Sequence, residues 1–301
     1  MKVTYGLKKI KKYKKPVVVL GVFDGVHLGH RRILKAAVKM ARRIRGTSIV
    51  ITFWPHPERE ESLYSLEHRL RLISELGIDV SIVISFNQKF ARTLAEDFIK
   101  NILVKKIGAQ YVYVGKNFRF GRYARGDFKL LKKLSRSYNF KLKVFTVIKI
   151  NRQTVSSTCI RRLIKKGELK SAEKLLTRPV SVLGTVVKGS SLARRLGFPT
   201  ANINPHHEIL PPQGVYTVKI IFRHQRLNGV CNIGTRPTFQ NRGERNIEVY
   251  IFNFKQNIYG QYLEIQFMKK IRNEKKFGSP CFLVEQIKKD ILRTKALLSH
   301  H

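Results

Sequence analysis

The residue types best suited to chemistry lie in one glycine-rich segment, Gly21-Val-Phe-Asp-Gly-Val-His-Leu-Gly-His30. It joins an apolar run to a helical pattern, so its glycines let the backbone approach a ligand, and free N–H groups at the helix start favour phosphate. His27 and His30 are three residues apart, which puts both rings on one face of a first helical turn. Imidazole donors there would stabilise charge on an α-phosphate under attack. Surface decoration, or a metal site with His56, would explain an isolated H-x-x-H, but the strand–glycine–helix context favours a nucleotide site.

Three more segments of the first half contain residue types that suit a nucleotide or an aromatic ligand. Gly115-Lys-Asn-Phe-Arg-Phe-Gly121 alternates glycine with arginine and aromatic side chains, which could hold a ring and a phosphate together. Ser156-Ser-Thr158 places hydroxyls at an expected helix start with Arg161 one turn further on, although an ordinary N-cap explains this segment equally well. Thr52-Phe-Trp-Pro-His-Pro57 ends an expected strand, where doubly wound folds bind their ligands.

The second half contains a separate set of polar candidates. Thr200 and Asn202 are two residues apart, so in extended backbone both side chains face one way, and two neutral oxygens side by side suit a Mg²⁺–ATP complex. Taken alone, a polar turn after Pro199 is the simpler interpretation. Glu248 lies in an alternating strand pattern, where partial desolvation would raise its pKa and make it a better proton acceptor. A strand-edge glutamate facing water is the competing interpretation.

The first half must position its candidates on alternating strands and helices. Short apolar runs alternate with helical patterns, which predicts a Rossmann-like parallel sheet covered by helices. The expected strands are residues 16–20, 48–53, 80–85, 111–114 and 143–147. The first expected helix has one apolar stripe, made of Ile33, Leu34, Ala37, Ala41 and Ile44.

After residue 178 the hydrophobic period changes to that of half-buried strands separated by Gly, Pro and Asn turns. The expected strands are residues 182–187, 215–221, 227–232, 247–254 and 262–271. They predict a small antiparallel β-barrel, followed by a helix with Ser279 as N-cap and Pro280 in the first turn. We expect Leu283, Ile287 and Ile291 of that helix to pack on the barrel. The sequence therefore predicts two domains, residues 1–178 and 179–301.

Composition adds one strong signal, a formal net charge of +41 from 60 Lys and Arg against 19 Asp and Glu. Such a charge attracts polyanions, that is nucleotides, RNA or an anionic membrane surface, and says nothing about fold. The basic residues are spread along the chain, with one local cluster: Lys8, Lys9, Lys11, Lys12, Lys14 and Lys15. Apolar residues make up 43% of the chain, enough to form cores in both halves, which argues against disorder.

The cysteines and the N-terminal segment indicate the cellular compartment of the protein. Cys159, Cys231 and Cys281 are an odd number and far apart, with no spacing typical of a metal site or a disulfide framework. A reducing cytosol is the simplest context, so we expect a cytoplasmic protein. The apolar run near the N-terminus stops at Asp24 without a cleavage pattern, which favours a buried strand over a signal peptide. No stretch approaches the length needed to span a bilayer.

The segments of the first half resemble, in order and spacing, the FMN adenylyltransferase module of the bacterial bifunctional riboflavin kinase/FAD synthetase family. The matching stretches are GVFDGVHLGH, TFWPHP, VGKNFRFG followed by RGD, and SSTCIR. The resemblance implies that His27 and His30 are catalytic. It implies an ATP site formed by Phe23, Asp24, Gly29, His30, Ser156, Thr158 and Arg161. It implies that a further group of residues faces the flavin or the adenine, and we expect these to form the flavin site: Pro55, His56, Pro57, Asn117, Phe118 and Arg119.

The second half is similar to the riboflavin kinase module of the same family. The matching stretches are GFPTAN, GVY at 214–216, NIGTRPTF at 232–239, IEVYIFNF at 247–254, YG at 259–260 and IRNEKKF at 271–277. The resemblance implies that Glu248 is the catalytic base. It implies that Mg²⁺–ATP is bound by Gly189, Thr200 and Asn202, the last two meeting the metal. It implies that the flavin side is shaped by Arg272, Glu274 and Phe277. The family's activity would convert riboflavin to FMN and FMN to FAD, with pyrophosphate released in the second step.

The chain departs from the family pattern at a few positions. Ala193 stands where a glycine is usual, which would stiffen the loop on the ATP side. Tyr250 and Asn253 replace a histidine and an aspartate that are common near Glu248, and Asn117 stands where many members have aspartate. Apart from Asn117, none of these positions is among the residues that the resemblance assigns to a site.

Two other functions fit parts of the sequence. Adenylyl transfer to another acceptor, such as a phosphopantetheine or a ribonucleotide, leaves the second-half motifs unexplained. A basic RNA-binding protein fits the charge and the HxGH-type motif of class I tRNA synthetases, but the chain has no room for an anticodon domain, and its aromatics follow strand patterns. We therefore expect riboflavin, FMN and ATP as substrates and Mg²⁺ with ATP. We expect no membrane partner, nucleic-acid contact only through non-specific charge, and at most weak self-association.

Overall fold

The computed structural model describes residues 1–55, 62–189, 196–235 and 245–299. The chain forms two compact units. The first unit comprises Met1–Ser62 and Leu66–Cys159, and the second comprises Leu63–Ser65 and Ile160–His301. Three residues from the front half of the chain are therefore part of the second unit.

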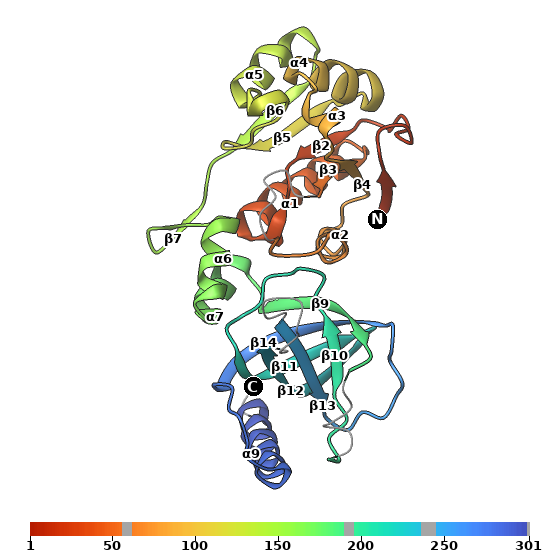
Figure 1. The fold of residues 1–301 in the computed structure, drawn as a ribbon. Coiled ribbons are helices and arrows are strands. Elements are labelled where there is room, and N and C mark those ends of the chain that lie inside the picture. The colour runs from red at the N-terminus through yellow and green to blue at the C-terminus, as the bar shows by residue number, and fades with distance from the viewer. Residues whose placement is uncertain (56–61, 190–195, 236–244, 300–301) are drawn as a thin grey trace. The chain divides into compact units, whose positions relative to one another are not determined.

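The first unit is built on a six-stranded sheet in which all paired strands are parallel (Figure 1). The strand order is β1-β4-β3-β2-β5-β6. The strands are β1 (Lys2–Tyr5), β2 (Val17–Leu20), β3 (Ser48–Trp54), β4 (Val80–Ser85), β5 (Tyr111–Gly115) and β6 (Lys141–Phe145). The predicted parallel sheet is confirmed. Sequence analysis missed β1, because this edge strand has one buried residue, Thr4, and so no clear alternation.

Helices cover both faces of this sheet. On one face lie α1 (Leu28–Arg43) and α2 (Leu66–Ser74), and on the other lie the π-helix η2 (Phe98–Ile107) and α5 (Phe128–Ser137). The buried side of α1 is formed by Ile33, Leu34, Ala37, Val38 and Ala41. This is the predicted apolar stripe, except that Ile44 lies at the C-cap and is only half-buried. The shorter helical turns are η1 (Asp24–Val26), α3 (Gln88–Ala91), α4 (Ala95–Asp97) and η3 (Arg122–Ala124).

Short elements connect the sheet to the second unit. A two-stranded ribbon of β7 (Lys149–Ile150) and β8 (Gln153–Thr154) follows β6. It is followed by α6 (Ser157–Lys165) and α7 (Leu169–Leu176), and α7 packs on the first and last strands of the barrel.

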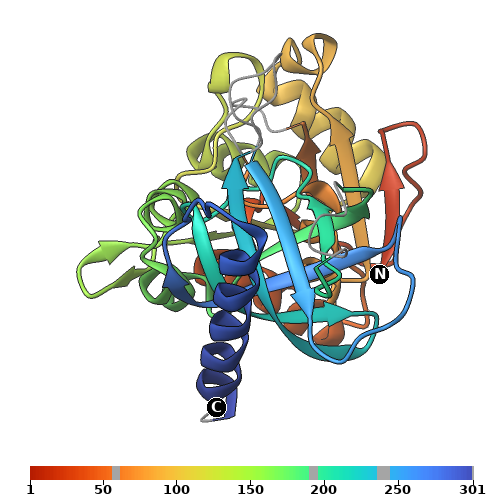
Figure 2. The same ribbon diagram turned by 60° about the horizontal axis from the view of Figure 1, so that its bottom comes forward.

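The second unit is a closed antiparallel barrel with the order β10-β13-β12-β11-β14-β9, seen from another side in Figure 2. Its strands are β9 (Val180–Val187), β10 (Ala201–Asn204), β11 (Gly214–Phe222), β12 (Gln225–Thr235), β13 (Arg245–Ile251) and β14 (Tyr262–Arg272). The predicted barrel is confirmed. It includes one strand more than expected, because β10 has only four residues. β13 ends three residues earlier than expected, shortly before Asn253 adopts a left-handed backbone conformation with φ 54°.

The last helix, α9 (Pro280–Ser299), packs on the barrel through polar residues. Ser279 Oγ accepts a hydrogen bond from Phe282 N at 3.5 Å, as expected for an N-cap. The predicted apolar stripe is only half-buried, and the fully buried residues of α9 are Asp290 and Thr294. Thr294 Oγ1 lies 3.3 Å from Thr217 Oγ1 of β11. Among the described residues, no helix combines the length and the apolar character needed to cross a membrane.

A buried carboxylate explains why residues 63–65 belong to the second unit. Glu208 is 4% exposed, and its Oε1 accepts hydrogen bonds from Ser65 N at 2.8 Å and Ser65 Oγ at 2.6 Å. Its Oε2 accepts from Leu183 N of β9 at 3.0 Å. The neighbouring Tyr64 ring is buried under the Arg178 guanidinium, and burial raises the pKa of its hydroxyl.

Candidate active sites

The candidate segments of the first unit follow adjacent strands of the sheet. Residues 21–30 follow β2, Pro55 follows β3, and residues 117–121 come shortly after β5; β3 and β5 both pair with β2. The chain adds β3 and β4 on one side of β2 and then returns to add β5 on the other side. Ligands of open parallel sheets bind at the carboxyl ends of the strands where the order reverses in this way. His56 and Pro57 lie outside the described residues.

The glycine-rich turn after β2 has an unusual backbone. Two non-glycine residues, Phe23 (φ 56°) and Val26 (φ 38°), adopt positive φ angles on either side of Asp24 and Gly25. Such conformations persist only where the surrounding structure holds them, and they concentrate at functional sites. The turn is buried, and Phe23 is 1% exposed.

The two histidines stack on one another at the start of α1. Their ring centroids lie 3.6 Å apart with an interplanar angle of 17°, and Phe23 packs edge-on against His30 at 5.2 Å. His27 is 6% exposed, and its Nδ1 accepts a hydrogen bond from His30 N at 3.3 Å. His27 is therefore the N-cap of α1, while His30 is half-buried. The expectation that both rings lie together is met, but His27 also has a capping role that the spacing alone did not indicate.

The hydroxyl segment at the start of α6 contacts the same turn. Ser157 Oγ donates a hydrogen bond to Asp24 O at 2.8 Å. Ser156 Oγ accepts from Cys159 N at 3.2 Å, which is an N-capping interaction. Thr158 is exposed, and Arg161 lies one turn further along, in the part of α6 that belongs to the second unit. Sequence analysis included Ser157 in this hydroxyl segment but assigned only its two neighbours to the ATP site.

Arg69 of α2 is a residue that sequence analysis missed. It is 1% exposed, its guanidinium donates to Val22 O at 2.7 Å, and it lies over the Trp54 ring at 5.0 Å. Thr52 Oγ1 donates to the same carbonyl at 2.8 Å. A buried cation beneath the glycine-rich turn adds positive potential where a phosphate would bind. In the sequence, Arg69 is one of 60 basic residues, and nothing distinguishes it.

In the segment after β5, Arg119 forms an ion pair with Asp127. Arg119 Nη1 lies 2.9 Å from Asp127 Oδ2. Asp127 also caps α5 by accepting from Lys129 N and Leu130 N. The backbone N–H of Leu130, together with the Arg119 guanidinium, holds the pKa of the Asp127 carboxyl below its ordinary value.

The Phe118 ring and the Asn117 amide of this segment have different surroundings. Phe118 stacks on Phe120 with centroids 5.7 Å apart and packs partly into the core. Asn117, by contrast, is exposed. The asparagine and arginine side chains of the segment are thus more open to a ligand than its first phenylalanine ring.

The barrel aligns three polar residues on neighbouring strands. Asn202 of β10 and Asn232 of β12 are both directly opposite Glu248 of β13. Side chains of directly opposed residues lie on the same face of a sheet. Glu248 is half-buried, and its Oε1 accepts from Asn246 Nδ2 at 2.7 Å. Sequence analysis did not identify Asn232, although it lies in a motif of the kinase resemblance.

Asn202 fits a magnesium–nucleotide complex. It is 7% exposed, and its Oδ1 has no hydrogen-bond partner among the described residues. A buried amide oxygen without a partner is the kind of neutral ligand that Mg²⁺ accepts. A Cβ atom on Gly189 would collide with the Asn202 amide, so a larger residue at this point would displace that side chain. Thr200 lies just before β10 and is half-buried. Ala193 lies outside the described residues.

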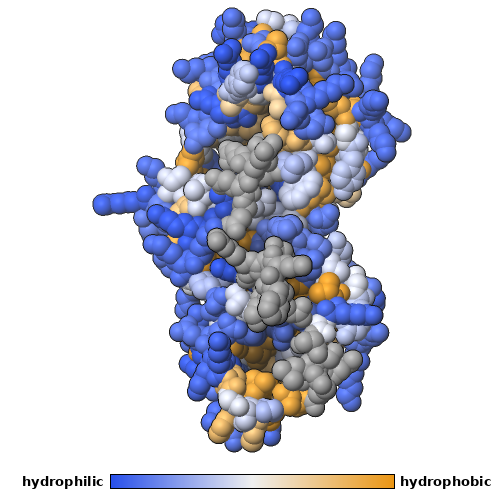
Figure 3. All heavy atoms as spheres, viewed as in Figure 1, coloured by the Kyte–Doolittle hydropathy of each residue, from blue (hydrophilic) through white to orange (hydrophobic). Residues whose placement is uncertain are grey.

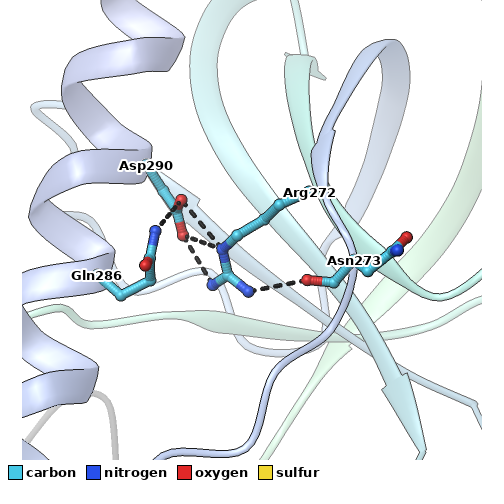
Figure 4. A network of polar contacts seen from close by, with 4 residues as sticks. All are labelled: Arg272, Asn273, Gln286 and Asp290. Atoms are coloured by element: carbon cyan, nitrogen blue, oxygen red, sulfur yellow. Dashed lines mark hydrogen bonds and ion pairs between the residues drawn. The ribbon is translucent and has the colours of Figure 1, made fainter.

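The end of β14 is connected to α9 by the network in Figure 4. Arg272 donates from Nε and Nη2 to the Asp290 carboxylate at 2.8–3.1 Å, and from Nη1 to Asn273 O at 3.0 Å. Gln286 Nε2 also donates to Asp290, at 2.9 Å. Asp290 is 4% exposed, and no sequence motif singled it out.

The other two residues assigned to the flavin side lie next to this network. The Phe277 ring lies 5.8 Å from the Arg272 guanidinium. The Glu274 carboxylate lies directly over the backbone of Gly234, in the strand that holds Asn232. A cavity of about 220 Å³ separates this segment from the start of α9. It is lined by Lys275, Lys276, Phe277, Gly278, Phe282, Glu285, Gln286 and Lys289.

Comparisons with known proteins find matches for both halves of the chain. Residues 9–159 match the family model described as FAD synthetase, and residues 176–298 match the model described as riboflavin kinase. The bifunctional riboflavin kinase/FMN adenylyltransferase of Buchnera aphidicola subsp. Schizaphis graminum is 38% identical over 97% of both chains. The enzyme of the same name from Bacillus subtilis is 37% identical over 92% of this chain and 90% of its own. A crystal structure described as a macrolide-efflux protein from Streptococcus pneumoniae superimposes with a TM-score of 0.83 at 29% identity, covering 98% of this chain and 99% of that one.

These matches extend over nearly the whole chain and include both candidate sites. The chain belongs to the bifunctional riboflavin kinase/FMN adenylyltransferase family, and it is a transferase that phosphorylates riboflavin to FMN and adenylylates FMN to FAD.

Proposed function

We propose that the phosphorylation of riboflavin takes place at the row of polar residues that joins β10, β13 and β12. Glu248 accepts the proton of the ribityl 5′-hydroxyl as that oxygen attacks the γ-phosphate of ATP. Thr200 and Asn202 bind the nucleotide with its Mg²⁺, and Gly189 leaves room for the Asn202 amide. Bound Mg²⁺ neutralises charge on the phosphates. The register that puts Asn202 opposite Glu248 is the observation that supports this assignment best.

The flavin side of this site is formed by the residues around the end of β14. Arg272 and Phe277 contact the flavin from one side, and Glu274 lies over β12 on the other. The network of Arg272 with Asp290 holds the guanidinium in a fixed direction, which lowers the entropy lost on binding.

The adenylylation of FMN takes place at the carboxyl edge of the parallel sheet. His30 stabilises the charge that builds on the α-phosphate, and His27 fixes His30 through stacking and through the N-cap of α1. ATP also contacts Phe23, Asp24 and Gly29, while Ser156, Thr158 and Arg161 bind its phosphates. The flavin is bound by Pro55, His56, Pro57, Asn117, Phe118 and Arg119.

Each of these two sites belongs to its own domain of the chain. Residues 1–178 make up the adenylyltransferase domain, and residues 179–301 make up the kinase domain. Riboflavin, FMN and ATP meet the enzyme in the cytoplasm, where ATP and flavin are both available and free thiols stay reduced.

Two single variants test whether the reactions use separate sites. We expect His30→Ala to slow FAD formation from FMN by about 10²–10³-fold, as for loss of an oxyanion donor, while FMN formation continues. We expect Glu248→Gln to show the reverse pattern, because the amide cannot accept the hydroxyl proton. Flavins separated by chromatography over time, with riboflavin or FMN as the starting material, measure both steps. Loss of both activities in either variant, with the protein still folded, would contradict the two-site assignment.

A further inference from the structure

The loop between β1 and β2 carries six lysines on the surface of the first unit. Its apolar residues Leu7, Ile10 and Tyr13 recur every third position and pack, partly buried, on the core under η2. The six lysines between and after them are all exposed: Lys8, Lys9, Lys11, Lys12, Lys14 and Lys15. The spacing of apolar anchors therefore directs the charged side chains outward. We call residues 7–15 the basic loop.

Neighbouring elements extend the charge of the basic loop. Lys106 at the end of η2 donates from Nζ to Leu7 O at 3.2 Å, and Lys105 beside it is exposed. At the other end, Thr47 N donates to Lys14 O at 2.9 Å, which brings the exposed Arg45 next to the loop. Segments far apart in sequence thus form one basic face, made of the six lysines together with Arg45, Lys105 and Lys106.

Little acidic charge offsets this face. Asp24 is the only acidic residue in the sequence of residues 1–57, and it is buried in the turn after β2. Asp79 lies near the Lys14 end, where its carboxylate accepts hydrogen bonds from Ser48 N at 2.8 Å and Ser48 Oγ at 2.6 Å. Within the described part of the chain, no lysine of the basic loop forms an ion pair.

The basic face does not include the glycine-rich turn with its two histidines. Lys14 and Lys15 come just before β2, whereas the glycine-rich turn with His27 and His30 comes just after it. These two lysines therefore lie at the opposite end of β2 from the glycine-rich turn. The other end of the basic loop follows the carboxyl end of β1, an edge strand that β4 and β3 separate from β2. Among the described residues, no hydrogen bond or ion pair joins the basic loop to a residue assigned to a substrate. Substrate binding does not account for these lysines.

We propose that the basic face binds the phosphate backbone of single-stranded RNA without reading its sequence. A flexible chain of closely spaced phosphates can meet several lysines of an extended loop at once, and the counterions released provide the binding free energy. An anionic membrane fits less well, because interfacial segments insert exposed apolar side chains and those of the basic loop face the core. This binding is a function in addition to flavin synthesis.

The test measures RNA binding by the full-length enzyme and by two variants that lose the same number of positive charges at different places. A short fluorescein-labelled RNA of mixed sequence is titrated by anisotropy between about 50 and 200 mM salt. In the loop variant, all six lysines of the basic loop are replaced by glutamine. We expect its affinity for the RNA at about 100 mM salt to fall at least ~10-fold. The plot of log affinity against log salt concentration should also become shallower by about 2–4, because each phosphate that the loop no longer neutralises contributes about 0.7 to its slope.

The control variant removes the same charge elsewhere. It replaces six exposed lysines of the second unit by glutamine: Lys166, Lys170, Lys174, Lys255, Lys288 and Lys295. We expect it to retain most of the RNA affinity, and a third variant with six Lys→Arg changes in the basic loop to bind like the wild type. FMN and FAD formation should be unchanged in the loop variant. Unchanged activity would show that this variant is folded. If it does not fold, the triple variant Lys8→Gln, Lys9→Gln, Lys11→Gln replaces it, with about half the change in slope.

Three outcomes would overturn the proposal. Equal loss of affinity in the loop and control variants would mean that only net charge matters. Absence of RNA binding by the wild type at about 100 mM salt would remove the function altogether. Binding to vesicles that contain anionic phosphatidylglycerol, together with no binding to RNA, would assign the face to a membrane surface.

Discussion

At the scale of single residues, Asp290 determines where the Arg272 guanidinium lies. The carboxylate is nearly buried, and it accepts three hydrogen bonds from Arg272 and one from Gln286. The guanidinium in turn lies 5.8 Å from the Phe277 ring. A change at position 290 therefore acts on Arg272, which we propose to lie on the flavin side of the kinase site.

We expect Asp290→Asn to lower the free energy of unfolding by about 1–3 kcal/mol, because it leaves the partly buried Arg272 without a charged partner. It should raise the KM for riboflavin more than it changes kcat, and leave the adenylylation of added FMN unaltered. Urea unfolding and steady-state kinetics measure these effects. Asp290→Glu, which keeps the charge, should recover part of the KM. An equal loss in both reactions would show that the network only stabilises the fold.

Cys231 of β12 is buried next to β13, the strand that holds Glu248. Its thiol is 0% exposed, and burial, with the Glu248 charge next in importance, raises its pKa well above the ordinary value. At neutral pH the thiol is protonated in both the folded and the unfolded chain, so it does not affect stability there. As the pH rises above the ordinary thiol pKa of about 8.5, only the unfolded chain releases its proton, and stability falls.

A thiol reagent at pH 8 tests this environment. We expect the exposed Cys281 to react rapidly in the native enzyme and Cys231 to react only after denaturation. Dithionitrobenzoate absorbance over time is measured in a Cys159→Ser background, which removes the third, half-buried thiol. Cys281→Ser then serves as the control that removes the fast phase. Rapid modification of Cys231 in the native state would mean that β12 and β13 separate under native conditions.

At the scale of elements, the 63–65 segment shows that a short stretch of chain can belong to a unit far from it in sequence. Glu208 accepts from Ser65 with one carboxylate oxygen and from β9 with the other. Two of the three donors are backbone N–H groups, which can only donate, and each meets a different carboxylate oxygen, so the site requires two acceptor oxygens. A segment that precedes the barrel by more than one hundred positions is therefore held to it by a single carboxylate.

We expect Glu208→Gln to destabilise the second unit by about 1–3 kcal/mol, because one acceptor becomes an NH₂ group that faces a buried donor. Thermal unfolding followed by fluorescence should show the change, and kinase activity should be lost at a lower temperature than in the wild type. Glu168→Gln removes the same charge at an exposed position and should have little effect. Equal stability of the two variants would mean that the segment contributes nothing to the barrel.

At the scale of the whole molecule, one chain combines a phosphorylating barrel with an adenylylating sheet, and the product of the first is the acceptor of the second. The same chain has 60 basic residues against 19 acidic ones, and the face drawn in Figure 3 is mostly hydrophilic. The resulting field attracts flavin phosphates, ATP and polyanions alike, and salt weakens all of these attractions. What distinguishes the basic face is that its lysines are held together by a packed loop.

The sequence by itself determined the two architectures, because their hydrophobic periods differ and each is repeated over many residues. It also determined the family, since motifs such as GVFDGVHLGH and GFPTAN are local in the chain. The glycine-rich turn and the α9 N-cap were predictable for the same reason, as they depend on a few consecutive residues. The predicted roles of His30, Glu248 and the other assigned residues remain predictions.

Only the tertiary structure decided which distant residues meet. The row formed by Asn202, Glu248 and Asn232 depends on strand register, and a shift by one residue would turn these side chains to the opposite face. The burial of Asp290 and Thr294, where an apolar stripe was expected, depends on which polar groups the barrel offers to α9. The basic face likewise required the fold, because it joins the basic loop to η2 and to the end of α1 through contacts that no local pattern encodes.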